Sequence, residues 1–122
     1  MKIFILICAL LFVGCATPYK KGSVHEWTTF DTAAELSVVS LMAVDWNQTI
    51  RIGRDCIETN PILGRCPSKT KLTLYFPSMM LGHAAVAWYS PQPLRMFWQG
   101  FYFFYEAGTV RKNAQLGYQL RF

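Results

Sequence analysis

Charged residues are scarce in this chain. Lys, Arg, Asp and Glu make up 16% of its 122 residues, whereas an average soluble domain carries about 25%. Hydrophobic residues reach 52%, and the chain holds nine Phe, six Tyr and four Trp. The length allows one domain at most. This composition is unusual for a soluble fold and favours contact with a membrane.

Motifs for common cofactors and reactions are also missing. His25 and His83 have no partner at metal-ligand spacing. The sequence holds no nucleophile elbow, phosphate-binding Gly-rich loop or dinucleotide fingerprint. The formal charge of +5 is not arranged as one basic stripe, so we expect no nucleic-acid partner. We therefore predict no metal, no cofactor and no catalytic residue.

The first fifteen residues are typical of an export signal. Lys2 precedes an apolar run over 3–13, and Gly14-Cys15 follows it. One positive charge, a short apolar core and a small residue at the end form a secretory signal. A Cys directly after Gly14 resembles the bacterial lipoprotein signal, in which that Cys is lipidated and becomes the mature N-terminus. The alternative is an uncleaved signal anchor over 1–15, and both interpretations direct the chain to a membrane.

Helix-breaking residues divide the rest of the chain. Asn60-Pro61 cannot lie within a helix, because Pro drives the preceding residue out of helical backbone. Ser68 is the predicted N-cap of the helix that follows. We expect helices over 32–54, 69–89 and 94–113, after a polar leader at 16–31 and before a tail at 118–122. The sequence therefore predicts an all-α fold, with a signal or anchor helix followed by a three-helix membrane-associated bundle over 32–117.

Length and charge placement favour helices that cross the bilayer. The stretch 72–90 is nineteen residues without a charge, long enough to span a bilayer at about 1.5 Å per residue. Eight positive charges lie after the first and third helices (Arg51, Arg54, Arg65, Lys69, Lys71, Arg111, Lys112 and Arg121), against three elsewhere after the signal (Lys20, Lys21 and Arg95). Because cytoplasmic loops of membrane proteins are rich in Lys and Arg, we expect the loop at 55–68 in the cytoplasm and the leader outside. The alternative is a compact lipid-anchored bundle.

Several polar residues fall inside these helices. Counted from the basic ends at about 1.5 Å per residue, Asp45 and Glu106 are expected at one depth and His83 and Gln99 at a deeper one. Gln48 and Thr49 share a helix face with Asp45 through i, i+3 and i+4 spacing. Such residues either form hydrogen bonds between helices or face a cavity with a proton-linked or catalytic role. The first interpretation is favoured, and the second stays open.

Cys56 and Cys66 bracket the loop between the first two helices. In an oxidising compartment this pair is suited to a disulfide, but a cytoplasmic loop keeps the thiols reduced. The two inferences conflict, and charge placement favours reduced thiols. Within the loop, Pro61 blocks helix continuation and Gly64 supplies backbone freedom. Glu58 and Asn60 are expected to bind free backbone groups, which makes Glu58, Asn60, Pro61 and Gly64 a structural or recognition loop.

The same region carries a resemblance. The segments concerned are Asp45-Trp46-Asn47-Gln48-Thr49, Glu58-Thr59-Asn60-Pro61-Ile62-Leu63-Gly64 and Pro67-Ser68, followed by Tyr75-Phe76, Gly82-His83, Trp98-Gln99, Glu106, Asn113 and Gly117. Over roughly 45–117 the chain resembles a group of small uncharacterised helical proteins of phages and bacterial prophages. The lipoprotein-like signal departs from that group. No activity is established for the group, so the resemblance implies a phage-linked, membrane-associated protein and nothing more specific.

These observations together predict a small membrane-anchored, non-catalytic accessory protein of the bacterial envelope. Its expected partners are the lipid bilayer and other envelope proteins, at the inner rather than the outer membrane. A small membrane enzyme or proton-linked module using Asp45, Glu106 and His83 is the first alternative. The second is a soluble lipid-anchored lipoprotein that binds a periplasmic partner.

Overall fold

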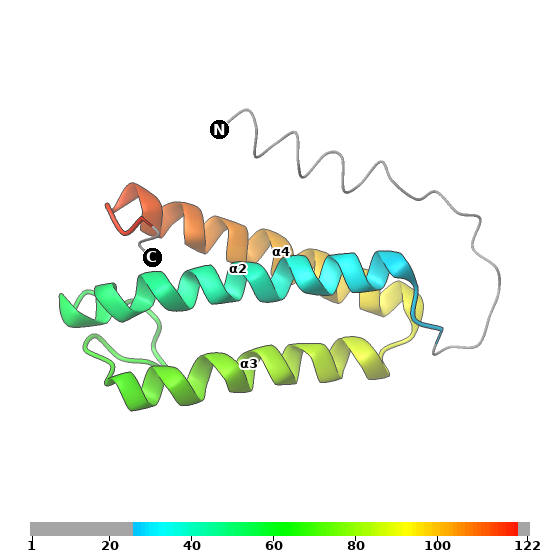
Figure 1. Cartoon of the computed structure of the whole chain (residues 1–122), viewed down its shortest axis with the longest axis horizontal. Helices are drawn as coiled ribbons and strands as arrows, with labels where there is room; N and C mark the ends of the chain where they lie inside the picture. The colour runs from blue at the N-terminus through cyan, green and yellow to red at the C-terminus, as the bar shows by residue number, and fades with distance from the viewer. Residues whose placement is uncertain (1–25, 120–122) are drawn as a thin grey trace.

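The computed structural model describes residues 26–119, which form three α-helices and no strand. Helix α2 covers Thr29–Arg54, α3 covers Lys69–Tyr89 and α4 covers Gln92–Gln115. Successive helices run in opposite directions (Figure 1), so the end of α2, the start of α3 and the end of α4 lie at one end of the bundle. The all-α, three-helix prediction is confirmed for this part of the chain. The signal or anchor over 1–15, including Cys15, lies outside the described residues, as do residues 16–25 of the leader and 120–122 of the tail.

Local capping sets the helix ends. Ser68 is the N-cap of α3, as predicted, and its side chain accepts a hydrogen bond from the Lys71 amide. Helix α2 begins three residues earlier than expected, because Thr28 and Asp31 form a reciprocal capping box. Helix α4 begins at Gln92, directly after its N-cap Pro91, with a proline in its first turn. A proline is tolerated there because the first amides of a helix lack partners in any case.

No helix within residues 26–119 is both long and apolar enough to cross a membrane. The expected bilayer span over 72–90 is therefore wrong. That stretch lacks charge, but Tyr75, Pro77, Ser78 and His83 break up its apolar side chains. Absence of charge was an insufficient criterion, because a spanning helix must be predominantly apolar.

The bundle buries many polar side chains and exposes many large apolar ones, although its interior also holds apolar residues such as Val38, Met42 and Ile52. Its buried polar side chains are Asp31, Gln48, Thr49, His83, Ser90, Arg95, Gln99, Glu106 and Asn113. Large apolar side chains are instead exposed along α3 (Leu74, Leu81, Val86, Trp88 and Tyr89) and along α4 (Leu94, Met96, Phe97, Phe101, Phe104 and Tyr105). On α2 the exposed large hydrophobic residue is Leu36. A small apolar core of Leu63, Leu72 and Phe76 lies where the loop meets α3.

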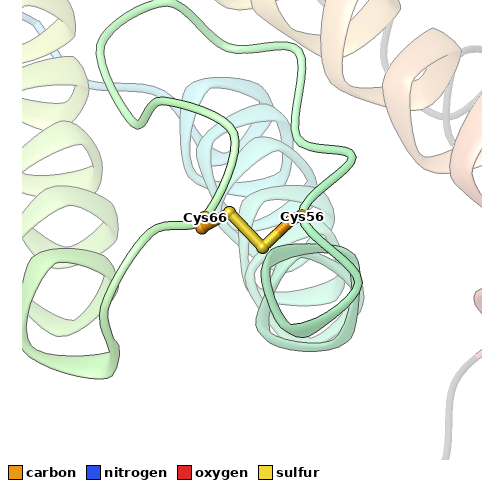
Figure 2. Close-up of a disulfide and its surroundings, with 2 residues drawn as sticks. All are labelled: Cys56 and Cys66. Carbon is orange, nitrogen blue, oxygen red and sulfur yellow. A yellow bond between two sulfur atoms is a disulfide. The ribbon is translucent and has the colours of Figure 1, made fainter.

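A disulfide closes the loop between α2 and α3. Figure 2 shows Cys56 just past the end of α2 joined to Cys66 on the segment that leads into α3. The pairing of these two cysteines is confirmed, and the expectation that they are reduced is wrong. Charge placement along the chain did not indicate that the two cysteines meet, with their Cα atoms 4.3 Å apart. Beside it, α2 passes the loop closely: a Cβ at Gly53 would lie 2.9 Å from Cγ of Pro67.

Candidate functional site

Arg95 and Asp31 are the most deeply buried charged residues of the described bundle. The Arg95 side chain is fully buried and donates to Asp31 Oδ2 at 3.0 Å, and Asp31 is also fully buried. The guanidinium also donates to the backbone carbonyls of Ala87, Ser90 and Glu26. Arg95 therefore fastens the α3–α4 turn to the start of α2. From the sequence, Arg95 was counted only among the positive charges outside the basic end of the bundle, and no partner was predicted for it.

The second polar cluster joins all three helices at His83. His83 Nδ1 lies 2.8 Å from Oε1 of Glu35 on α2, and Gln99 Nε2 on α4 donates to the other oxygen of that carboxylate at 3.0 Å. His83 and Gln99, which were expected at one level, both contact Glu35. The His83 ring also stacks on Trp98, at 5.5 Å between centroids. Glu35 was not identified from the sequence, where no carboxylate stands near His83.

The third cluster surrounds Asp45, in the half of the bundle that carries the loop. Asp45 Oδ1 accepts hydrogen bonds from Asn113 Nδ2 at 2.8 Å and from Thr49 Oγ1 at 3.4 Å. Thr49 therefore shares a face with Asp45, as its spacing indicated. Gln48, the third residue predicted on that face, is buried and donates to the Val110 carbonyl of α4 at 3.3 Å. The bonds of Asn113 and Gln48 join α2 to α4, whereas the Thr49 bond lies within α2.

A cavity of about 590 Å³ opens beside Asp45, among all three helices and the loop. Its lining includes three carboxylates (Asp45, Glu58 and Glu106), one ammonium (Lys112) and a set of aromatic rings (Tyr75, Phe76, Phe101, Tyr102 and Tyr105). This volume falls in the range of small-molecule sites. His83 is not part of the lining, so Asp45 and Glu106 come together as predicted, whereas His83 belongs to a separate cluster.

Glu106 differs from the other two carboxylates. Its side chain is buried, at 8% exposure, and its Oε2 atom is buried without a hydrogen-bond partner. Burial, with the nearby charge of Asp45, raises the pKa of Glu106 to about 7. Burial and the charge of Glu58 raise the pKa of Asp45 to about 6, against opposing hydrogen bonds from Thr49 and Asn113. The pKa values of both carboxyl groups therefore lie close to neutral pH.

Two loop side chains that line the cavity are fixed by hydrogen bonds. Glu58 Oε1 accepts hydrogen bonds from the amides of Thr59 and Asn60, and Asn60 Oδ1 accepts one from the Ile62 amide. Asn60 Nδ2 also donates to the Tyr75 hydroxyl at 3.0 Å. The three bonds to backbone amides lie within the loop, and the Tyr75 bond joins the loop to α3. Gly64 has φ of 74°, a left-handed conformation that favours glycine.

Within residues 26–119, no group of three His, Cys, Asp or Glu side chains could hold a metal ion. The chain matches no protein-family model, no curated protein and no solved structure.

Proposed function

We propose that this protein is a small, exported, non-catalytic accessory protein that associates with the bacterial envelope membrane. In this proposal, lipid covers the outer surfaces of α3 and α4, and a lipid on Cys15 is the anchor. The inner membrane is the expected location, and the resemblance described above suggests a phage or prophage setting.

The exposed aromatic surface is the observation that carries the proposal. Along α4, Phe97, Phe101 and Phe104 are 70%, 55% and 70% exposed. The i, i+4 and i+7 spacing places them on one face of the helix. Full transfer of one such side chain out of water contributes about 1.5–3 kcal/mol. A continuous exposed apolar surface of this kind marks a membrane or protein contact.

Charge supports lipid as the partner for this surface. The end of the bundle that holds the loop carries Arg51, Arg54, Arg65, Lys69, Lys71, Arg111 and Lys112. Basic residues next to an apolar surface are attracted to anionic lipid headgroups, at about 1 kcal/mol for each Lys or Arg near the surface. An apolar surface with a basic end therefore fits a lipid interface better than a second protein.

The disulfide supports export. Disulfides persist in oxidising compartments and are rare in the bacterial cytoplasm. The Cys56–Cys66 bond therefore favours a loop on the outer side of the inner membrane, opposite to the side inferred from charge. Under this arrangement the basic end contacts headgroups of the outer leaflet.

Quenching of tryptophan fluorescence by brominated lipids tests the proposal. Two single-tryptophan forms of the full chain are compared in phosphatidylglycerol vesicles: one keeps Trp88, which is 57% exposed on α3, and the other keeps Trp46, which packs on Phe76. We expect strong quenching of Trp88 and weak quenching of Trp46. Equal, weak quenching of both would refute a lipid-covered surface. Palmitate labelling of wild type, absent from Cys15→Ser, tests the anchor separately.

A proton-linked module is the second candidate function. The shared cavity of Asp45 and Glu106 and their raised pKa values favour it. His83 would not take part, since it contacts Glu35 instead. Asp45→Asn and Glu106→Gln distinguish the two functions. The accessory role requires that both variants keep wild-type stability and phenotype, whereas a proton-linked role requires loss of phenotype at undiminished stability.

A further inference from the structure

We propose that the cavity between the three helices and the 55–68 loop binds the primary ammonium group of an organic amine. The inference goes beyond the proposed membrane role and does not depend on it. It rests on four properties of the cavity: its size, its excess of carboxylates, an unpartnered buried acceptor and its aromatic walls.

The excess of acidic groups in the cavity lining favours a cationic ligand. Asp45, Glu58 and Glu106 contribute three carboxyl groups, and Lys112 contributes one ammonium. In residues 26–119, no ion pair joins Lys112 to any of the three. The acidic groups are therefore not neutralised by the protein itself. A bound cation would relieve their mutual repulsion, which a neutral or anionic ligand could not do.

Glu106 identifies the type of cation. Its unpartnered Oε2 atom is buried, and the side chain lines the cavity. A buried acceptor without a donor is costly, typically by about 1–3 kcal/mol, so a ligand that donates a hydrogen bond here gains affinity. A primary ammonium offers three N–H donors, whereas a quaternary ammonium offers none. Asp45 already accepts from Asn113 and Thr49, which makes Glu106 the main contact.

The aromatic rings define the rest of the ligand. Tyr75, Phe76, Phe101, Tyr102 and Tyr105 form apolar walls around the acidic groups. Aromatic faces attract organic cations and cover an attached hydrocarbon chain. A metal ion would use neither property. The ligand class is thus an alkylamine, either free in solution or as the headgroup of an aminophospholipid.

Binding should depend on pH. The groups that line the cavity and could influence Glu106 are Asp45 on α2, Glu58 in the loop, Tyr75 on α3 and Tyr102, Tyr105 and Lys112 on α4. Protons on Asp45 and Glu106 compete with the ammonium for the same carboxyl oxygens. With pKa values of about 6 and 7, both groups lose their protons as the pH rises from 5 to 8. Affinity should therefore increase over that range, by up to about tenfold per pH unit for each proton released.

Calorimetric titration of n-butylammonium into the full chain in maltoside micelles tests the proposal. We expect saturable binding at pH 8 that weakens at least tenfold at pH 5 and at least tenfold in Glu106→Gln. Butyltrimethylammonium, which lacks N–H donors, should bind at least tenfold more weakly. Glu26→Gln removes an exposed carboxylate that does not line the cavity and is the matched control, with unchanged binding expected.

Several results would overturn the proposal. These are no saturable binding by wild type, equal binding by Glu106→Gln, or equal binding by the trimethyl compound. If Glu106→Gln does not fold, Asp45→Asn replaces it with the same expected loss. Competition by phosphatidylethanolamine, but not by phosphatidylcholine, would identify a lipid headgroup as the source of the amine, whereas competition by free amines alone would identify a soluble ligand. Lipid quenching of Trp88 is measured separately, so failure of either proposal leaves the other standing.

Discussion

Replacement of Arg95 by Met provides a direct test of the polar interior. The variant keeps an unbranched apolar chain but removes the guanidinium that binds Asp31 and the carbonyls of Ala87 and Ser90. Both Arg95 and Asp31 are fully buried, so the variant leaves a carboxylate without its counter-charge. Removal of one partner from a buried ion pair costs about 3–5 kcal/mol. For a bundle of this size, that corresponds to a melting temperature lower by roughly 12 °C or more.

Urea and thermal unfolding followed by circular dichroism measure this loss. In the double variant Arg95→Met with Asp31→Asn, the orphaned charge is also gone, so part of the stability should return. Arg111→Met is the matched control, because Arg111 is exposed near the end of α4, and it should change stability by less than about 0.5 kcal/mol. A loss below about 1 kcal/mol in Arg95→Met would refute the argument, since it would mean that Asp31 does not need a buried partner.

Three further predictions concern the loop and the cavity. Replacing Cys56 and Cys66 with Ser should lower the free energy of unfolding by about 2.7 kcal/mol, the loop-closure value for a separation of 10 residues. Equal free energies of unfolding for wild type and variant in denaturant titrations would contradict a stabilising disulfide. Gly64→Val should lower the free energy of unfolding by about 1–2 kcal/mol, because φ at this position is 74°. If the variant is fully stable but has lost its biological effect, the loop is a recognition surface. Stability should fall as the pH rises from 4 to 8, by up to about 1.4 kcal/mol for each unit by which the two pKa values are raised, because the folded-state pKa values of Asp45 and Glu106 are raised to about 6 and 7 and the protonated forms favour folding. In thermal unfolding over the same pH range, the stability of Asp45→Asn should depend less on pH than that of wild type. An unchanged pH dependence would refute this prediction.

Local signals in the sequence were sufficient to predict the helices. Ser68 before an apolar run and Pro61 after Asn60 defined the loop and the start of α3, because capping and proline geometry act within a few residues. Helical rise along the chain was also enough to bring Asp45 near Glu106 and His83 near Gln99. These predictions needed distances along helix axes, which sequence separation supplies directly.

The partners of the buried charges required information that the sequence lacks. Glu35 meets His83 because α2 is rotated to place that face inward, and such a rotation depends on packing among all three helices. Arg95 shows the same limit: it was predicted near the start of the last helix, but nothing in the sequence indicates that its side chain reaches Asp31 on α2. Asp31 had been assigned to the leader and was therefore not considered as a partner.

The polar interior of α4 links the stability of the bundle to its surroundings. A water-soluble bundle gains stability mainly by burying apolar side chains, but here α4 directs Arg95, Gln99, Glu106 and Asn113 inward and exposes Phe97, Phe101 and Phe104. Hydrogen bonds of the buried polar groups contribute only about 0.5–1.5 kcal/mol each where water competes. A lipid surface would cover the aromatic side chains and lower the local dielectric, which strengthens the interior ion pair and hydrogen bonds together. The same surroundings would favour the neutral form of Glu106 until a cation enters its cavity.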